Sequence, residues 1–351
     1  MAQLLELHAG LEVPGGRLGA AQAASVALVE FSVALLPGPL PEEAARLAEH
    51  RAAALARQEG LGAVAPLAYL ALALLLVRRG DADGHAEAER LCQRVLAGES
   101  ADDPLRRMAL AAVIVSRQAR GLQHADVSAT WAAALSPADC SPEVMAAQLS
   151  AIFDPEAALR AFLAGDPGAR LGAGTIAGQL RRQGRTGELL ELHAGFGKPE
   201  GPHELEQARS LECVAYNVLL EPGLPPGVLG EAASRVEWIA ARYPHAQHEG
   251  PEGRAALEHT LALARLRQGR FAEVEPLCAP ALAVDVGADN RATVLATIAL
   301  GRRALGQPYA GLVTEAVALS PDADLVPEAQ QASPWGPASS GFARRSSPGV
   351  I

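Results

Sequence analysis

Apolar residues recur at three- and four-residue spacing along much of the chain, a pattern typical of helices with one buried stripe. The pattern is clearest around the turn Gln268-Gly269-Arg270. Gly269 stands where a helix needs a left-handed C-terminal residue, and the cation Arg267 just before it favours the helix dipole. We therefore predict one helix from Ala256 to this turn and a second that ends near Val284-Asp285. The stripe consists of Leu257, Leu261 and Ala264 before the turn and Val274, Leu277 and Ala281 after it.

The same plan repeats along the chain. A helix is predicted from Asn290 to Ala304, with Gly306 at the turn, and another from Tyr309 to Leu319, ended by Ser320-Pro321. Similar turns are predicted at Gly80, Gly121 and Gly184. Helix pairs that recur about every 34 to 40 residues are typical of solenoids, in which each pair buries its apolar stripe against the neighbouring pairs.

A longer repeat encloses these pairs. The heptapeptide LLELHAG occurs at Leu4–Gly10 and again at Leu189–Gly195, an offset of 185 residues. At this offset 18 of the 38 residues from Leu4 to Pro41 are identical. Later landmarks pair at nearly the same offset, among them Leu91-Cys92 with Leu277-Cys278 and Arg117 with Arg302. Bias toward Ala and Leu does not produce ordered matches at His, Pro, Gly and Cys, so we infer an internal duplication.

The duplication bears on the one membrane candidate, the uncharged run from Leu61 to Val77. Its counterpart near Glu252–Arg267 reads EGRAALEHTLALARLR and is amphipathic. Equivalent elements of a duplicated array occupy equivalent places, so the run is predicted to be a buried core helix. No membrane partner is expected.

Two segments of the second half resemble the tetratricopeptide repeat: Arg267–Asp285 and Ala304–Ala323. They carry its turn glycine (Gly269, Gly306), an aromatic just beyond it (Phe271, Tyr309) and the small residue of the second helix (Ala281, Ala316). The first helices lack the family's Trp and Tyr, and Val274 stands where Ala is usual. The resemblance implies an all-α, right-handed α–α superhelix whose first helices line a concave surface for a peptide or protein.

We divide the chain into a first helical-repeat half (1–140), connecting helix pairs (141–188), a second half (189–326) and a disordered tail (327–351). Within the connection, Pro142 and Asp154-Pro155 are predicted helix starts. The tail is assigned from its Pro, Ser and Gly content and its lack of apolar periodicity.

Composition narrows the classes of partner and the compartment. The net charge of −10 argues against general attraction to nucleic acid. The four cysteines (Cys92, Cys140, Cys213, Cys278) form no CxxC pair, and the N-terminus shows no signal sequence. They are predicted to be reduced and mostly buried in a cytoplasmic protein.

No catalytic or cofactor motif stands out, so neither a cofactor nor a metal is expected. His245, His248 and Glu249 form a short group of possible metal ligands in one loop. No further ligand group that would complete a metal site is identifiable in the sequence. His8 and His193 recur within the heptapeptide and are predicted to share a packing or capping role.

The candidate binding residues are cations just before the inter-helix turns: Arg78, Arg182, Arg267 and Arg303. If they stack along a concave groove, with His259 and Thr297 on the same face, they would bind carboxylates of an acidic partner. An arginine in a last turn also stabilises the helix dipole without any partner. The favoured function is a non-enzymatic protein- or peptide-binding scaffold. The alternatives are an effector-sensing region resembling the helical repeats of bacterial transcriptional activators, and an enzyme on a helical scaffold.

Overall fold

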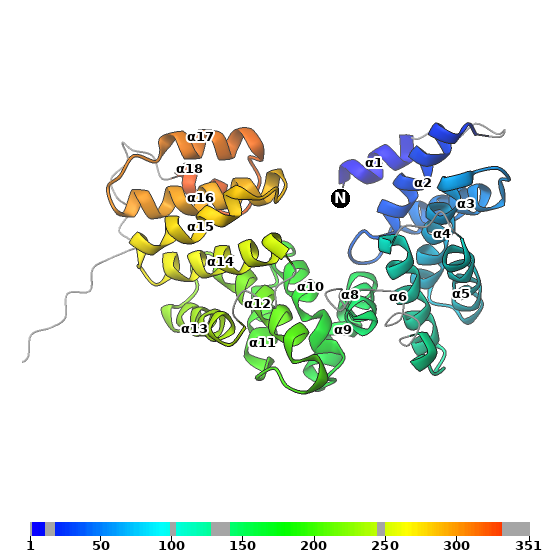
Figure 1. Cartoon of the computed structure of the whole chain (residues 1–351), viewed down its shortest axis with the longest axis horizontal. Helices are drawn as coiled ribbons and strands as arrows, with labels where there is room; N and C mark the ends of the chain where they lie inside the picture. The colour runs from blue at the N-terminus through cyan, green and yellow to red at the C-terminus, as the bar shows by residue number, and fades with distance from the viewer. Residues whose placement is uncertain (1, 11–17, 99–102, 128–140, 244–249, 332–351) are drawn as a thin grey trace, which may run out of the picture. The chain divides into compact units, whose positions relative to one another are not determined.

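The computed structural model describes residues 2–10, 18–98, 103–127, 141–243 and 250–331. Within these ranges the chain forms α-helices and short 3₁₀ helices and no strand, which confirms the predicted all-helical class (Figure 1). The chain splits into two compact units, Met1–Glu221 and Pro222–Ile351. This division by packing differs from the one that we predict from the sequence repeat, which places a boundary at residue 188.

Unit 1 is a succession of helices in which each packs against its neighbours in sequence. α4 packs against α5, α5 against α6, and α10 against both α8 and α12. The helices are α1 (Ala2–Gly10), α2 (Ala20–Ala34), α3 (Glu42–Arg57), α4 (Ala65–Arg79), α5 (Ala82–Ala97), α6 (Asp103–Ala119), α8 (Pro142–Phe153), α9 (Pro155–Leu163), α10 (Ala169–Arg182), α11 (Thr186–Gly195) and α12 (Glu204–Leu220), with 3₁₀ helices η1 (Gly62–Val64) and η2 (Gly201–His203).

α4 is the centre of the unit 1 core. It packs against α2, α3, α5 and α6, and every residue from Leu70 to Val77 is buried. By length and composition the segment Gly62–Arg79 is the one helix of the described ranges that could cross a membrane, and most of it is buried inside the protein. This burial agrees with the prediction of a core helix.

Unit 2 continues the pattern with α13 (Pro226–Arg242), α14 (Gly250–Arg267), η4 (Phe271–Glu273), α15 (Val274–Ala283), α16 (Ala288–Ala304), α17 (Ala310–Leu319) and α18 (Val326–Gln331). α16 is its central helix and packs against α14, α15, α17 and α18. The ten residues Ala292–Gly301 are all buried. Residues 327–331, which the sequence pattern assigns to the tail, lie in α18, and residues 332–351 lie outside the described ranges.

The helix ends follow local chemistry. Gly80, Gly121, Gly184, Gly269 and Gly306 all have positive φ, which confirms the predicted left-handed turns. α8 begins at Pro142 after the N-cap Ser141. α9 begins at Pro155, where the carboxylate of Asp154 accepts a hydrogen bond from the Ala157 amide at 2.8 Å. These contacts confirm both predicted helix starts.

Candidate protein-binding surface

Arg78 is held by the backbone of its own unit. Its guanidinium donates hydrogen bonds to the carbonyls of Ala34, the last residue of α2, and of Leu36 and Gly38 in the segment that follows. The same group lies 5.2 Å from the centre of the Phe153 ring. Burial lowers the pKa of Arg78 to about 10. Arg78 therefore satisfies a carbonyl at the end of α2 and two carbonyls of the turn that follows it.

Arg267 is also engaged within the protein. Its Nη1 and Nη2 atoms each lie 3.3 Å from a carboxylate oxygen of Glu328, and 9% of its side chain is exposed. The pair joins the end of α14 to α18. The sequence pattern did not predict this contact, because it assigned Glu328 to the tail.

Arg182 and Arg303 are the two predicted cations with exposed side chains. Arg182 ends α10 in unit 1, and Arg303 lies in the last turn of α16 in unit 2. Within the described ranges, no hydrogen bond or ion pair joins the Arg303 side chain to another residue. Of the four arginines, Arg303 therefore offers the guanidinium best placed for a partner.

His259 and Thr297 do meet, but in the interior of unit 2. Nε2 of His259 lies 3.2 Å from the Thr297 hydroxyl oxygen, and the two side chains are buried between α14 and α16. Burial lowers the pKa of His259 to about 4, so its ring is neutral at physiological pH. A partner-binding role for this pair remains a prediction, and the contact that the structure shows is between the two helices.

A row of arginine–glutamate pairs, which sequence reasoning missed, joins successive helices. In each pair an arginine at the end of one helix, or just beyond it, contacts a glutamate of the preceding helix 27 to 30 residues earlier. Arg117 and Arg302 each place Nε 2.8 Å from the glutamate oxygen. The pairs are Arg79–Glu49, Arg117–Glu89, Arg185–Glu156, Arg265–Glu237 and Arg302–Glu275.

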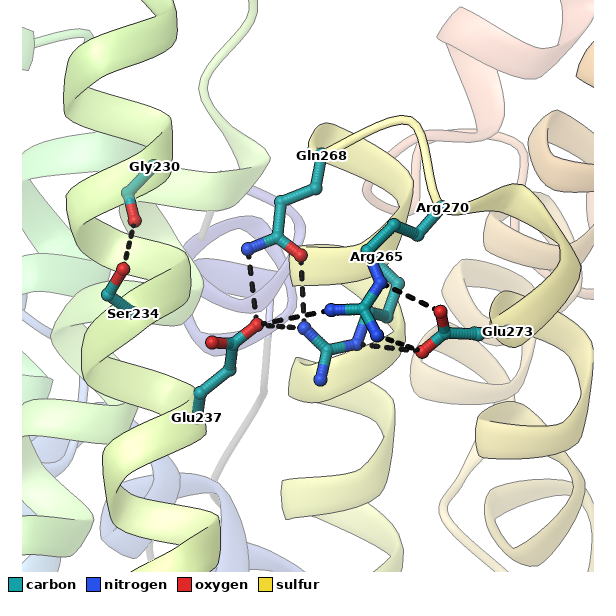
Figure 2. A network of polar contacts seen from close by, with 7 residues as sticks. All are labelled: Gly230, Ser234, Glu237, Arg265, Gln268, Arg270 and Glu273. Carbon is teal, nitrogen blue, oxygen red and sulfur yellow. Dashed lines mark hydrogen bonds and ion pairs between the residues drawn. The ribbon is translucent and has the colours of Figure 1, made fainter.

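Figure 2 shows the most extended of these contacts. Glu237 of α13 contacts Arg265, Gln268 and Arg270, and Glu273 contacts the same two arginines from the opposite side. Arg270 binds Glu273 through two parallel hydrogen bonds of 2.7 Å. Two cations and two carboxylates thus balance one another, so this cluster holds the α14–α15 turn against α13.

A cavity of about 440 Å³ lies beside another of these pairs, between α15 and α16. Its wall is mostly apolar and includes Phe271, Pro276, Ile298 and Leu305, and the paired Glu275 and Arg302 supply charge. Leu305 is 45% exposed. An apolar lining with a few polar groups is typical of ligand-binding pockets.

The described ranges contain no group of three or more His, Cys, Asp and Glu side chains that could hold a metal ion. The candidate ligands His245, His248 and Glu249 lie outside these ranges, as does Cys140. Cys92 and Cys278 are buried free thiols, and Cys213 is an exposed one. His8 and His193 are both buried, at 1% and 2% exposed, as their predicted packing role requires.

The glutamates of these pairs also recur in the sequence. A Glu 27 to 30 residues before an Arg near a turn glycine recurs in both halves. The predicted column of arginines facing a partner does not include this recurrent glutamate.

Comparison with family models, with curated proteins and with solved structures finds no match to this chain.

Proposed function

We propose that the chain is a non-enzymatic scaffold that binds an acidic peptide or protein segment through unit 2. The observation that carries this proposal is the exposed guanidinium of Arg303, in the last turn of α16. Two residues close to it in sequence, Arg302 and Leu305, line the 440 Å³ cavity. The segment would place an apolar side chain in the cavity and a carboxylate on Arg303.

The scaffold itself would be a tetratricopeptide-like array of helix pairs in a right-handed superhelix. Each second helix of a pair packs against the first helix of the next, as α3 does on α4, α5 on α6 and α15 on α16. The recurrent arginine–glutamate pairs lie at these same junctions. Because the same type of contact recurs at five helix junctions, it supports the regularity expected of a repeat protein.

The internal duplication is part of this proposal. Arg117–Glu89 and Arg302–Glu275 correspond at the 185-residue offset or within three residues of it, and so do Arg79–Glu49 and Arg265–Glu237. Two pairs of contacts that match in type and order support descent of the halves from one ancestral array.

A selection from a displayed random peptide library on the full chain tests the binding role. We expect enriched peptides that combine acidic residues with an aromatic or aliphatic residue. Arg303→Glu should weaken their binding by about tenfold or more, because it replaces attraction with repulsion at the carboxylate. Arg46→Glu makes the same charge change at an exposed arginine of unit 1 and should leave the affinity unchanged.

Two results would overturn the proposal. One is enrichment of peptides that lack acidic residues. The other is equal loss of binding in Arg303→Glu and Arg46→Glu, which would show only a dependence on net charge.

A further inference from the structure

The heptapeptide LLELHAG forms a helix at both of its positions, α1 and the end of α11, but the two copies have different surroundings. Leu192 of α11 is fully buried. Its counterpart Leu7 of α1 is 58% exposed. A single exposed leucine needs no explanation on a protein surface. Here, however, the equivalent leucine of an identical heptapeptide is fully buried. The comparison therefore identifies a face of α1 that another element can cover.

The final glycine of the heptapeptide also has different surroundings in the two copies. A Cβ placed on Gly195 would lie 3.2 Å from Cε1 of Phe162, a side chain of α9. A Cβ placed on Gly10 would meet no atom of the residues that the structure describes within 4 Å. The space that the phenyl ring of Phe162 fills against α11 is therefore open against α1.

The helices that cover α11 are known. α11 packs against α9, α10 and α12, and the rings of Phe162 and Phe196 have centroids 5.6 Å apart. α1 packs against α2 and α3. The covering elements that differ are α9 and α10, two consecutive short amphipathic helices, with Phe162 near the end of the first.

We propose that the exposed face of α1, defined by Leu7 and Gly10, is a docking site for a partner's helix hairpin of the α9–α10 type. The partner would bring an aromatic side chain to Gly10, as Phe162 does at Gly195, and aliphatic side chains to Leu7. A second copy of this chain is a poorer occupant, because its Phe162 is only 5% exposed and already packs on α11.

This inference rests on the proposed scaffold function and deepens it by naming a second class of partner. The site lies in unit 1 and uses apolar contact, whereas the acidic-peptide site lies in unit 2 and uses Arg303. Arg303→Glu should therefore leave docking on α1 unchanged, so that the two proposals fail independently.

The probe is a fluorescent, hydrocarbon-stapled peptide of residues 155–182, which is the hairpin that the chain itself uses at α11. It is titrated with the full chain, and anisotropy reports binding. We expect saturable binding that Leu7→Glu weakens at least about tenfold, because a carboxylate would be buried against apolar side chains. The peptide variant Phe162→Ala should weaken binding to the wild-type chain as well.

Gly10→Val provides a second test that removes no apolar group. A Cβ at Gly10 meets no atom of the described residues within 4 Å, and thermal melting checks that the variant is folded. It should still block docking, because the phenyl ring needs that space. Leu122→Glu changes a leucine that is 49% exposed elsewhere in unit 1 and should leave the affinity unchanged.

Three results would overturn the proposal. The first is absence of peptide binding to the wild-type chain. The second is equal binding to wild type and Leu7→Glu, which would show that the peptide replaces α9–α10 on α11. The third is a dimer of the full chain, detected by sedimentation, that Leu7→Glu dissociates, because a second copy would then cover the face.

Discussion

His8 and Glu30 face each other in the interior of unit 1, where Nε2 of the histidine lies 3.0 Å from Oε2 of the glutamate. Neither side chain is more than 1% exposed. Arg51 lies 3.7 Å from the other carboxylate oxygen and donates a hydrogen bond of 2.7 Å to the His8 carbonyl. The 185-residue offset pairs Glu30 with Ala215, so this buried acid belongs to the first half alone.

Glu30 should make unit 1 less stable as the pH rises. Burial raises the pKa of Glu30 to about 8, and Arg51 opposes part of that rise. The unfolded state releases the proton of this carboxyl above about pH 4.5, whereas the folded state keeps it up to about pH 8. The free energy of unfolding therefore falls as the pH rises from 4.5 to 8 and levels off above that range. Between pH 6.5 and 8.5 the loss should be on the order of 1–2 kcal/mol, measured by urea denaturation.

Glu30→Gln should remove this dependence, because the amide does not ionise. Burial also lowers the pKa of His8, with a smaller contribution from Arg51, and this effect acts below pH 6.5 and outside the chosen window. Glu6→Gln, an exposed glutamate of α1, is the matched control and should behave as wild type. An unchanged pH slope in Glu30→Gln would show that the acid does not titrate in this window.

The arginine–glutamate pairs should differ in their contribution to stability according to burial. Glu89 is 14% exposed and contacts both Arg117 and Arg120, whereas Glu275 is 47% exposed. Glu89→Ala removes a shared carboxylate from two half-buried cations, which keep Asp126 and the Ser116 carbonyl as acceptors, and should cost about 1–3 kcal/mol. Glu275→Ala breaks an exposed pair and should cost less than about 1 kcal/mol. Urea denaturation of both variants compares the costs, and equal values would contradict the dependence on burial.

Gly174 lets α10 and α12 approach closely. A Cβ at this position would lie 2.7 Å from the Cβ of Cys213, so one helix must move. We expect Gly174→Ala to lower the stability by about 1–3 kcal/mol in thermal or urea denaturation. Gly230→Ala in α13 is the matched control, since its Cβ would meet nothing within 4 Å. That variant should be more stable than wild type by about 0.5–1 kcal/mol, because alanine favours the helix.

The sequence predicted what depends on local pattern. The turn glycines, the proline helix starts and the buried run in α4 each follow from residues close in the chain. The four predicted arginines differ in their tertiary contacts, which no local sequence pattern predicts. Arg78 caps α2 and Arg267 binds Glu328, which is 61 residues away, whereas Arg303 stays exposed. Which of several equivalent cations remains available depends on packing between distant helices.

The contact between His259 and Thr297 should contribute measurably to the stability of unit 2. The Thr297 hydroxyl donates its one hydrogen to the Thr293 carbonyl at 2.8 Å, so its oxygen accepts from Nε2–H of His259. Thr297→Val keeps the shape of the side chain but leaves a buried N–H without this acceptor. The variant should lose about 1–3 kcal/mol in urea denaturation.

Thr297→Ser separates the hydrogen bond from packing, because it keeps the hydroxyl and loses only the methyl group. It should cost less than Thr297→Val, and a cost equal to or above that of the valine variant would assign the effect to packing. Burial lowers the pKa of His259 to about 4, so the stability that its neutral ring contributes is complete above pH 6.5 and declines as the pH falls toward 4. Nitrogen NMR of the ring should accordingly show a neutral imidazole with its proton on Nε2 at pH 5.5, where an exposed histidine is mostly charged.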